Sequence, residues 1–189
     1  MRYRCILLVV ALAGSFVLKA QDNPLGNGLR ESYQVYKTFL LAEAERMPDA
    51  DYSFKPTPEA ETFGSRVAHV ADSLIGVCSG AKGVRSVHAP TDKTSKADLV
   101  AELKMAFDYC DGPYSSLADA TAAQEVIVFG RRMSKLTALW GNLAHIQEQY
   151  GYMAVYLRLK GLTPPLDDPK LQMSVKRPGK VMEAPAVNK

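Results

Sequence analysis

His145 and Gln149 are the residues whose types and spacing most suggest chemistry. A separation of four places both side chains on one face of an α-helix, about 40° apart, so both could reach one ion. Imidazole nitrogen suits zinc, nickel and similar metals, whereas the neutral amide oxygen of glutamine is a hard, weak donor toward them. Glu148 could substitute as a ligand or act as a base, but it points about 100° away from Gln149. The pair therefore predicts weak metal binding.

The periodicity of the same helix leaves two interpretations of this pair open. On an ideal helix, His145 and Gln149 lie roughly opposite an apolar stripe that includes Leu136, Leu143 and Ala154. Either the helix buries two faces and the pair lines a cleft, or His145 is an ordinary residue of a polar face.

Other candidates for chemistry are few. Cys5 falls in a predicted signal peptide, so the mature chain would keep two cysteines, Cys78 and Cys110. These two could form one disulfide in an oxidising compartment. Each of the two, however, sits in an apolar helical pattern, where a free cysteine behaves as a small hydrophobic residue. We therefore predict two free buried thiols and leave the bridge as the alternative. The sequence contains neither a glycine-rich phosphate loop nor a G-x-S-x-G motif.

Residues 1–20 have the pattern of a signal peptide. Arg2 and Arg4 precede an apolar run that is short and interrupted, and Ala20 is a suitable residue before a cleavage site. We expect a secreted or periplasmic protein without stable membrane insertion after cleavage. The formal net charge of +3 comes from this segment, since 20 basic residues face 20 acidic residues from Gln21 onward. A neutral mature chain does not favour nucleic acid as a partner.

The elements that would position these residues are four helices. Apolar residues recur at steps of three, four or seven in each of them. The predicted helices span about residues 24–47, 62–81, 95–117 and 131–160, and residues 124–129 form either a short extended stretch or an early helical turn. Thr62 and Ser95 are N-cap candidates. We predict an all-α four-helix bundle over residues 24–165, with no convincing strand pairs, followed by a disordered tail over residues 166–189.

Two regions of the sequence resemble the DinB family. The first is DYSFKPTPE at 51–59, with TFG at 62–64 and VAHVAD at 67–72; the second is WGNLAHIQEQYG at 140–151, with YLRLKGLTPP at 156–165. The resemblance implies a bundle with up-down-down-up topology. It also implies, for many members, a divalent metal held by one histidine of the second helix and two of the last.

Carried onto this sequence, the family pattern selects His69, His145 and Gln149 as metal ligands, with glutamine in place of the third histidine. Asp72 could orient His69 from behind. Together with the predicted signal peptide, the resemblance leads us to expect an exported protein with a degenerate zinc or nickel site. By resemblance, it would act on an unknown small molecule as a hydrolase or thiol transferase. The alternative is a non-catalytic binding protein, or a dimeric structural bundle, that has lost its metal. In either case, exposed apolar helix faces could pair two copies of the chain as a homodimer.

Overall fold

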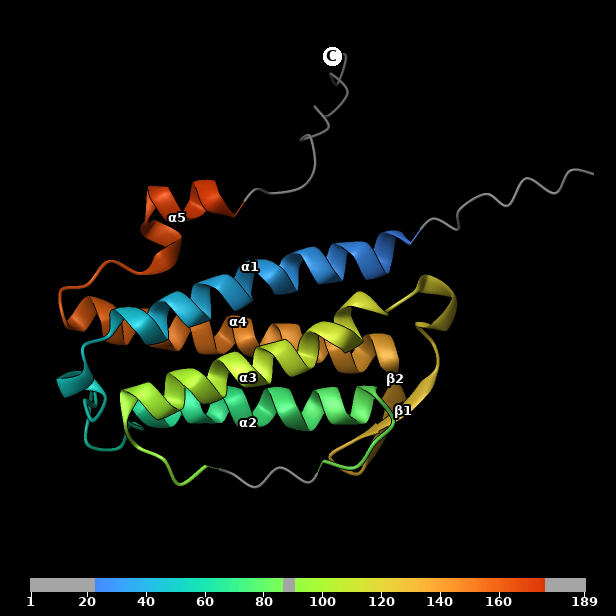
Figure 1. Ribbon diagram of the computed structural model, residues 1–189, viewed down its shortest axis with the longest axis horizontal. Helices are drawn as coiled ribbons and strands as arrows, with labels where there is room; N and C mark the ends of the chain where they lie inside the picture. Colours follow the sequence, from blue (N-terminus) through green and yellow to red (C-terminus); the bar gives the residue numbers. More distant parts are fainter. Residues whose placement is uncertain (1–22, 87–90, 176–189) are drawn as a thin grey trace, which may run out of the picture.

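Four long helices form the body of the protein, and a computed structural model describes residues 23–86 and 91–175 (Figure 1). The helices are α1 (Pro24–Arg46), α2 (Phe63–Ala81), α3 (Lys96–Ser115) and α4 (Lys135–Leu159). The prediction of an all-α four-helix bundle is confirmed. The predicted signal peptide lies outside the described residues. No helix in the described ranges combines the length and apolar character that crossing a membrane requires.

Side-chain caps explain where three of the helices begin. Thr62, Ser95 and Ser134 each accept a hydrogen bond from the backbone N–H three residues later, at 3.0, 3.2 and 3.0 Å. Each oxygen satisfies an amide that has no partner inside its own helix. Pro113 lies inside α3 and does not stop it, because the helix continues to Ser115.

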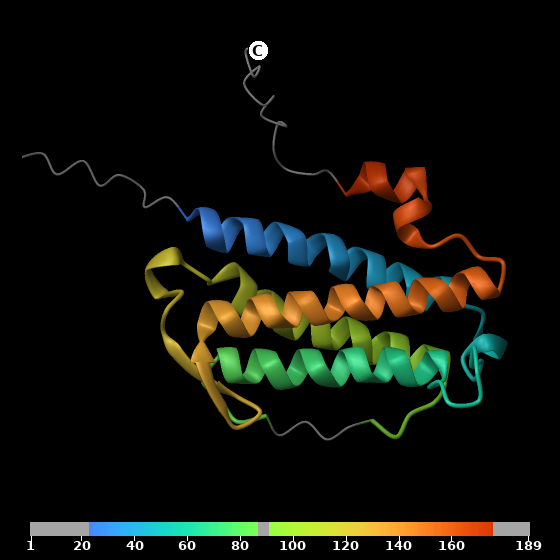
Figure 2. The ribbon, with the colours of Figure 1, turned by 180° about the vertical axis from the view of Figure 1, so that it is seen from behind.

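The helices run up, down, down and up, as Figures 1 and 2 show from opposite sides. α1 and α4 are parallel neighbours, and the ring of Tyr36 packs 5.8 Å from that of Tyr150. α2 and α3 are also parallel neighbours. Between the two pairs, α1 packs against α3 and α4 packs against α2. This arrangement brings α2 and α4 together as antiparallel neighbours, which is the pairing that matters for the candidate site.

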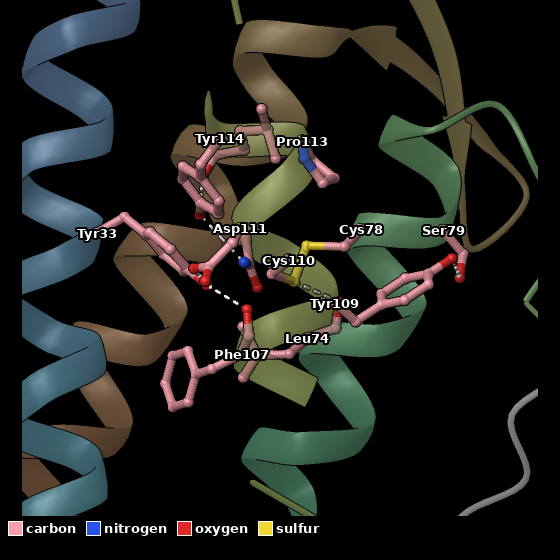
Figure 3. Close-up of a disulfide and its surroundings, with 12 residues drawn as sticks. Tyr33, Leu74, Cys78, Ser79, Phe107, Tyr109, Cys110, Asp111, Pro113 and Tyr114 are labelled. Carbon is pink, nitrogen blue, oxygen red and sulfur yellow. Dashed lines mark hydrogen bonds between the residues drawn. A yellow bond between two sulfur atoms is a disulfide. The ribbon is translucent and has the colours of Figure 1, made fainter. Parts of the chain in front are cut away.

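A buried aromatic group joins α1, α3 and α4 in the core (Figure 3). Tyr33 is fully buried, its ring lies 3.8 Å from that of Tyr114, and its hydroxyl donates to the carbonyl of Phe107 at 2.8 Å. The hydroxyl of Tyr114 donates to the carbonyl of Leu139 at 2.8 Å. Both hydroxyls therefore have the partners that burial requires.

Cys78 of α2 and Cys110 of α3 form a disulfide (Figure 3). Their Cα atoms are 5.4 Å apart, which suits such a bridge. The prediction of two free thiols is therefore wrong. Both residues are fully buried on apolar helix faces, as expected. The sequence pattern did not indicate that parallel packing of α2 and α3 brings these two positions to the same level.

A β-hairpin precedes α4, so the prediction of no strand pairs is wrong. β1 (Glu125–Val128) pairs antiparallel with β2 (Arg131–Ser134). The turn between them has Phe129 at φ 49° and Gly130 at φ 76°. Positive φ at both central residues matches the twist of a two-residue hairpin. Residues 131–134, predicted as helix, are strand, and α4 begins only after its cap.

The chain after α4 is ordered further than predicted. A 3-10 turn, η3 (Pro165–Asp167), and a short helix, α5 (Pro169–Ser174), follow the last long helix. Arg46 of α1 pairs with Asp168 at 2.8 Å, and the N–H of Leu166 donates to the hydroxyl of Tyr150 at 2.9 Å. Predicted disorder is therefore wrong for residues 166–175, and residues 176–189 lie outside the described part of the chain.

Candidate functional site

The two histidines selected from the sequence come together between α2 and α4. The ring centroids of His69 and His145 are 5.0 Å apart, and the ring planes are inclined at 77°. The helices are antiparallel here, because Tyr156 near the end of α4 donates to the carbonyl of Glu61 just before α2, at 2.7 Å. One histidine from each helix therefore reaches the same level of the bundle.

α4 buries two faces, which decides between the two interpretations of its periodicity. One face meets α1 and the other meets α2. Gln149 is only 2 % exposed, and the side chain of His145 is 28 % exposed. His145 is therefore not an ordinary polar-face residue. Trp140 of the same helix, in contrast, is 62 % exposed.

The ring of His145 has one nitrogen engaged and one free. Nδ1 lies 3.5 Å from Oε2 of Glu148, one turn along the same helix. Nε2 is buried and has no hydrogen-bond partner within the described residues. Burial, together with the neighbouring His69, lowers the pKa of His145, and Glu148 opposes this shift. A neutral ring that donates from Nδ1 to Glu148 would leave the lone pair of Nε2 available to a ligand.

Gln149 does not stand free beside this pair. Its Oε1 accepts a long hydrogen bond, 3.4 Å, from Nη1 of Arg66 on α2. The guanidinium carbon of Arg66 lies 4.8 Å from the centre of the Tyr152 ring, and Nε lies 3.2 Å from Oε2 of Glu61 with ion-pair rather than hydrogen-bond geometry. Arg66 was not predicted as a site residue. Its position three residues before His69 placed it on the same face of α2.

A cleft of about 470 Å³ opens beside His69. His69 and Asp72 line one wall of it, and hydroxyl-bearing side chains line much of the rest. The remaining polar lining includes Ser53, Thr62, Ser65, Thr91, Asp92, Lys93 and Thr94. His69 is thus shared between the pair of rings and a space that could hold a small molecule.

The donor set fits a metal in part. The free, buried Nε2 of His145 and the carboxylate behind Nδ1 are what a metal-binding imidazole needs. His69 supplies a second imidazole within reach. Gln149 does not fit as the third ligand, because its oxygen is engaged by a permanent cation. Among the described residues, no group of three or more histidine, cysteine or acidic side chains is placed to hold a metal ion.

The comparisons with known proteins agree with this fold. The family model described as the DinB superfamily matches residues 34–170. A crystal structure of a DinB-like protein from Bacillus cereus ATCC 10987 is 21 % identical with a TM-score of 0.62, over 74 % of this chain and 95 % of that one. A DinB-like protein from Bacillus subtilis is 20 % identical with a TM-score of 0.60, over 72 % and 94 %. No curated protein matched. The chain belongs to the DinB superfamily.

Proposed function

We propose that this protein is exported and that His69 and His145 weakly bind a divalent metal ion, zinc or nickel, at the edge of the cleft. A small molecule in the cleft would be its ligand. A bound ion of this kind acts as a Lewis acid and activates water, which is the chemistry that a hydrolase or thiol transferase of this family would use. The chain's own residues hold and orient the two imidazoles.

The observation that supports this proposal most is the orientation of His145. A buried ring nitrogen without a partner is costly unless something occupies the space in front of it. Glu148 holds the opposite nitrogen, as a carboxylate does behind many metal-binding histidines. Two imidazoles without a third strong ligand should bind zinc or nickel less tightly than three.

Calorimetric titration of untagged protein with Zn²⁺ and Ni²⁺ tests the proposal. We expect saturable binding of one ion, which is lost in both His69→Ala and His145→Ala. Loss in both variants is expected because neither imidazole alone would retain the ion. If the wild-type protein binds no ion, or if either alanine variant binds as the wild type does, the pair is not a metal site.

Gln149→His should strengthen the site by restoring a third imidazole. We expect at least about tenfold tighter binding, which adds about 1.4 kcal/mol of stability at saturating metal. Thermal melting with and without Ni²⁺ measures this. Gln147→His is the matched control, because Gln147 is an exposed neighbour on α4 and should give no gain. Equal gains in both variants would indicate binding elsewhere.

The second candidate is a non-catalytic binding protein that has lost its metal. The contact between Arg66 and Gln149 favours it, since a guanidinium already supplies positive charge beside the two rings. Under this reading, neither the wild-type protein nor Gln149→His binds a divalent ion. The same titrations therefore separate the two candidates.

Export is supported by the disulfide. A buried bridge between Cys78 and Cys110 forms and persists in oxidising compartments such as the periplasm or the extracellular space. The homodimer stays a prediction, and sedimentation equilibrium of the mature protein measures it. Leu25 and Trp140, 55 % and 62 % exposed, border an apolar groove of about 640 Å³ that such an assembly could cover.

A further inference from the structure

Arg66 contacts Gln149 at the position where Gln149 would otherwise face a metal ion. Arg66 lies one turn before His69 on α2, and Gln149 lies one turn after His145 on α4. Because these helices are antiparallel, the two turns meet, and Nη1 of Arg66 reaches Oε1 of Gln149 at 3.4 Å. The site therefore consists of two imidazoles at one level and a cation–amide pair at the next.

The guanidinium is fixed in orientation but keeps donors to spare. Its side chain is 22 % exposed, one face lies over Tyr152, and Nε faces Glu61. A guanidinium has five N–H donors in a planar fork. Within the described residues, Nη1 bonds Gln149 and no hydrogen bond is made by Nη2. Glu61 is 55 % exposed, so water screens its hold on the charge.

A fixed cation beside two metal-binding imidazoles has an electrostatic consequence. It repels a divalent ion, and this repulsion falls when an anion binds between the two positive charges. Carboxylates match the guanidinium fork and are also oxygen ligands for divalent metals. His69 lines the hydroxyl-rich cleft and Arg66 does not, so the rest of such a molecule would have to extend past His69 to enter the cleft.

We propose that the site takes a small carboxylate ligand, that Arg66 selects it, and that metal and carboxylate bind cooperatively. This inference rests on the proposed metal site at His69 and His145. It assigns Arg66 as a positioning residue with two opposite effects. Arg66 weakens metal binding when no anion is present and couples metal to anion when one is.

Calorimetric titration of the mature protein with Ni²⁺, with and without succinate, tests the coupling. In the wild type, succinate should raise Ni²⁺ affinity about five- to tenfold, and Ni²⁺ should raise succinate affinity by the same factor. In Arg66→Gln, Ni²⁺ should bind about tenfold more tightly than in the wild type without succinate, because the repulsion is gone. Succinate should then give no further gain.

Two further variants keep the result interpretable. Arg66→Lys retains the charge but not the fork, so its Ni²⁺ affinity should stay low and its coupling should fall. Arg132→Gln removes an arginine that is likewise paired with a glutamate, Glu125, but lies on the hairpin, and it should behave as the wild type. Succinate also binds Ni²⁺ in solution, and this effect is equal for all variants. Melting of the metal-free variants checks that each is folded.

The outcomes separate the inference from the function on which it rests. Ni²⁺ binding to the wild type that does not respond to succinate overturns the inference and leaves the metal site standing. Coupling of equal size in Arg66→Gln also overturns it. No Ni²⁺ binding to any variant overturns both. Coupling that only Arg66 confers supports the inference.

Discussion

Glu43 is the residue most at odds with its surroundings. It lies on α1 with no exposed surface, and neither carboxyl oxygen has a hydrogen-bond partner in the described ranges. Burial raises the pKa of Glu43 to about 10, although Arg158 and Arg46 act in the opposite direction. Those two arginines pair instead with Asp167 and Asp168. Glu43 is therefore held as a neutral acid at neutral pH.

This raised pKa predicts how stability varies with pH. The folded state keeps the proton of Glu43 that the unfolded chain releases above its ordinary pKa of 4.5. The contribution is therefore fully present below pH 4.5 and is lost as pH rises toward 10. Glu43→Gln should be more stable than the wild type by about 1–3 kcal/mol at pH 8, with a smaller difference at pH 5.

Urea unfolding at several pH values measures this effect. Glu45→Gln is the control, because Glu45 is half exposed, pairs with Lys104 at the surface and should change stability little. A Glu43→Gln variant that is less stable at every pH would show that the carboxyl is ionised and paired in the fold.

At this scale, the family resemblance selected His69 and His145 correctly as a converging pair of rings. It could not identify Arg66, because a lone arginine carries no metal-ligand signature. The role of Gln149 as an acceptor for Arg66 depends on which residue of α2 lies opposite it. That pairing is a property of helix packing and not of spacing along one helix.

Among the elements, the hairpin packs on a glycine surface of α2. A Cβ added at Gly80 would lie 2.5 Å from the carbonyl oxygen of Ile127 and 2.7 Å from Val128. Gly80→Ala should therefore destabilise the protein by about 1–3 kcal/mol. Gly151→Ala on α4 meets nothing within 4 Å and should stabilise by about 0.5–1 kcal/mol through helix propensity. Thermal unfolding of the two variants should shift in opposite directions, and parallel shifts would contradict the packing.

The disulfide is the covalent link between α2 and α3. It joins residues 32 apart, and closing a loop of that length in the unfolded chain accounts for about 3–4 kcal/mol. Replacing Cys78 and Cys110 together by alanine should lower stability by about this amount. Reductant should lower the melting temperature of the wild type and leave the double variant unchanged. A wild type insensitive to reductant when unfolded in its presence would contradict the estimate.

Elements with strong local signals were predicted well. The two predicted caps, Thr62 and Ser95, and an apolar repeat placed α2 and α3 to within a few residues. The first strand of the hairpin agrees with the extended alternative for residues 124–129, but its partner strand was missed. Four-residue strands carry little periodicity, and residues 131–134 adjoin a helix whose pattern could be extended over them. The ordered segment after Pro165 was missed because its order comes from Arg46 and Tyr150, distant in sequence.

At the scale of the whole molecule, the proposed export predicts where the mature chain begins. Expressed from its own first residue in a Gram-negative host, the protein should reach the periplasm and begin at Gln21. N-terminal sequencing and intact mass of the periplasmic fraction measure this. Ala20→Leu should slow cleavage, because the residue before the cut must be small. A periplasmic or membrane-retained chain that still carries Met1 would contradict cleavage after Ala20.

The bundle itself was predictable because four long amphipathic stretches allow few other folds. Its topology came from the family resemblance alone. Nothing in the periodicity of a helix states whether its neighbours run parallel or antiparallel. That choice determines the disulfide, the pairing of His69 with His145 and the position of Arg66.

Asn23 ties the start of α1 to the segment after α3, close to the predicted cleavage site. Its Nδ2 donates to the carbonyl of Leu117 at 2.8 Å, and its Oδ1 accepts from the N–H of Asp119 at 2.6 Å. A cut after Ala20 would leave two residues ahead of this anchor. Proteases bind extended chain, and so short a lead would not reach an active site once Asn23 has docked. If the chain is exported as proposed, cleavage would then have to precede folding, and the rate of folding would set what fraction of the chain stays uncleaved.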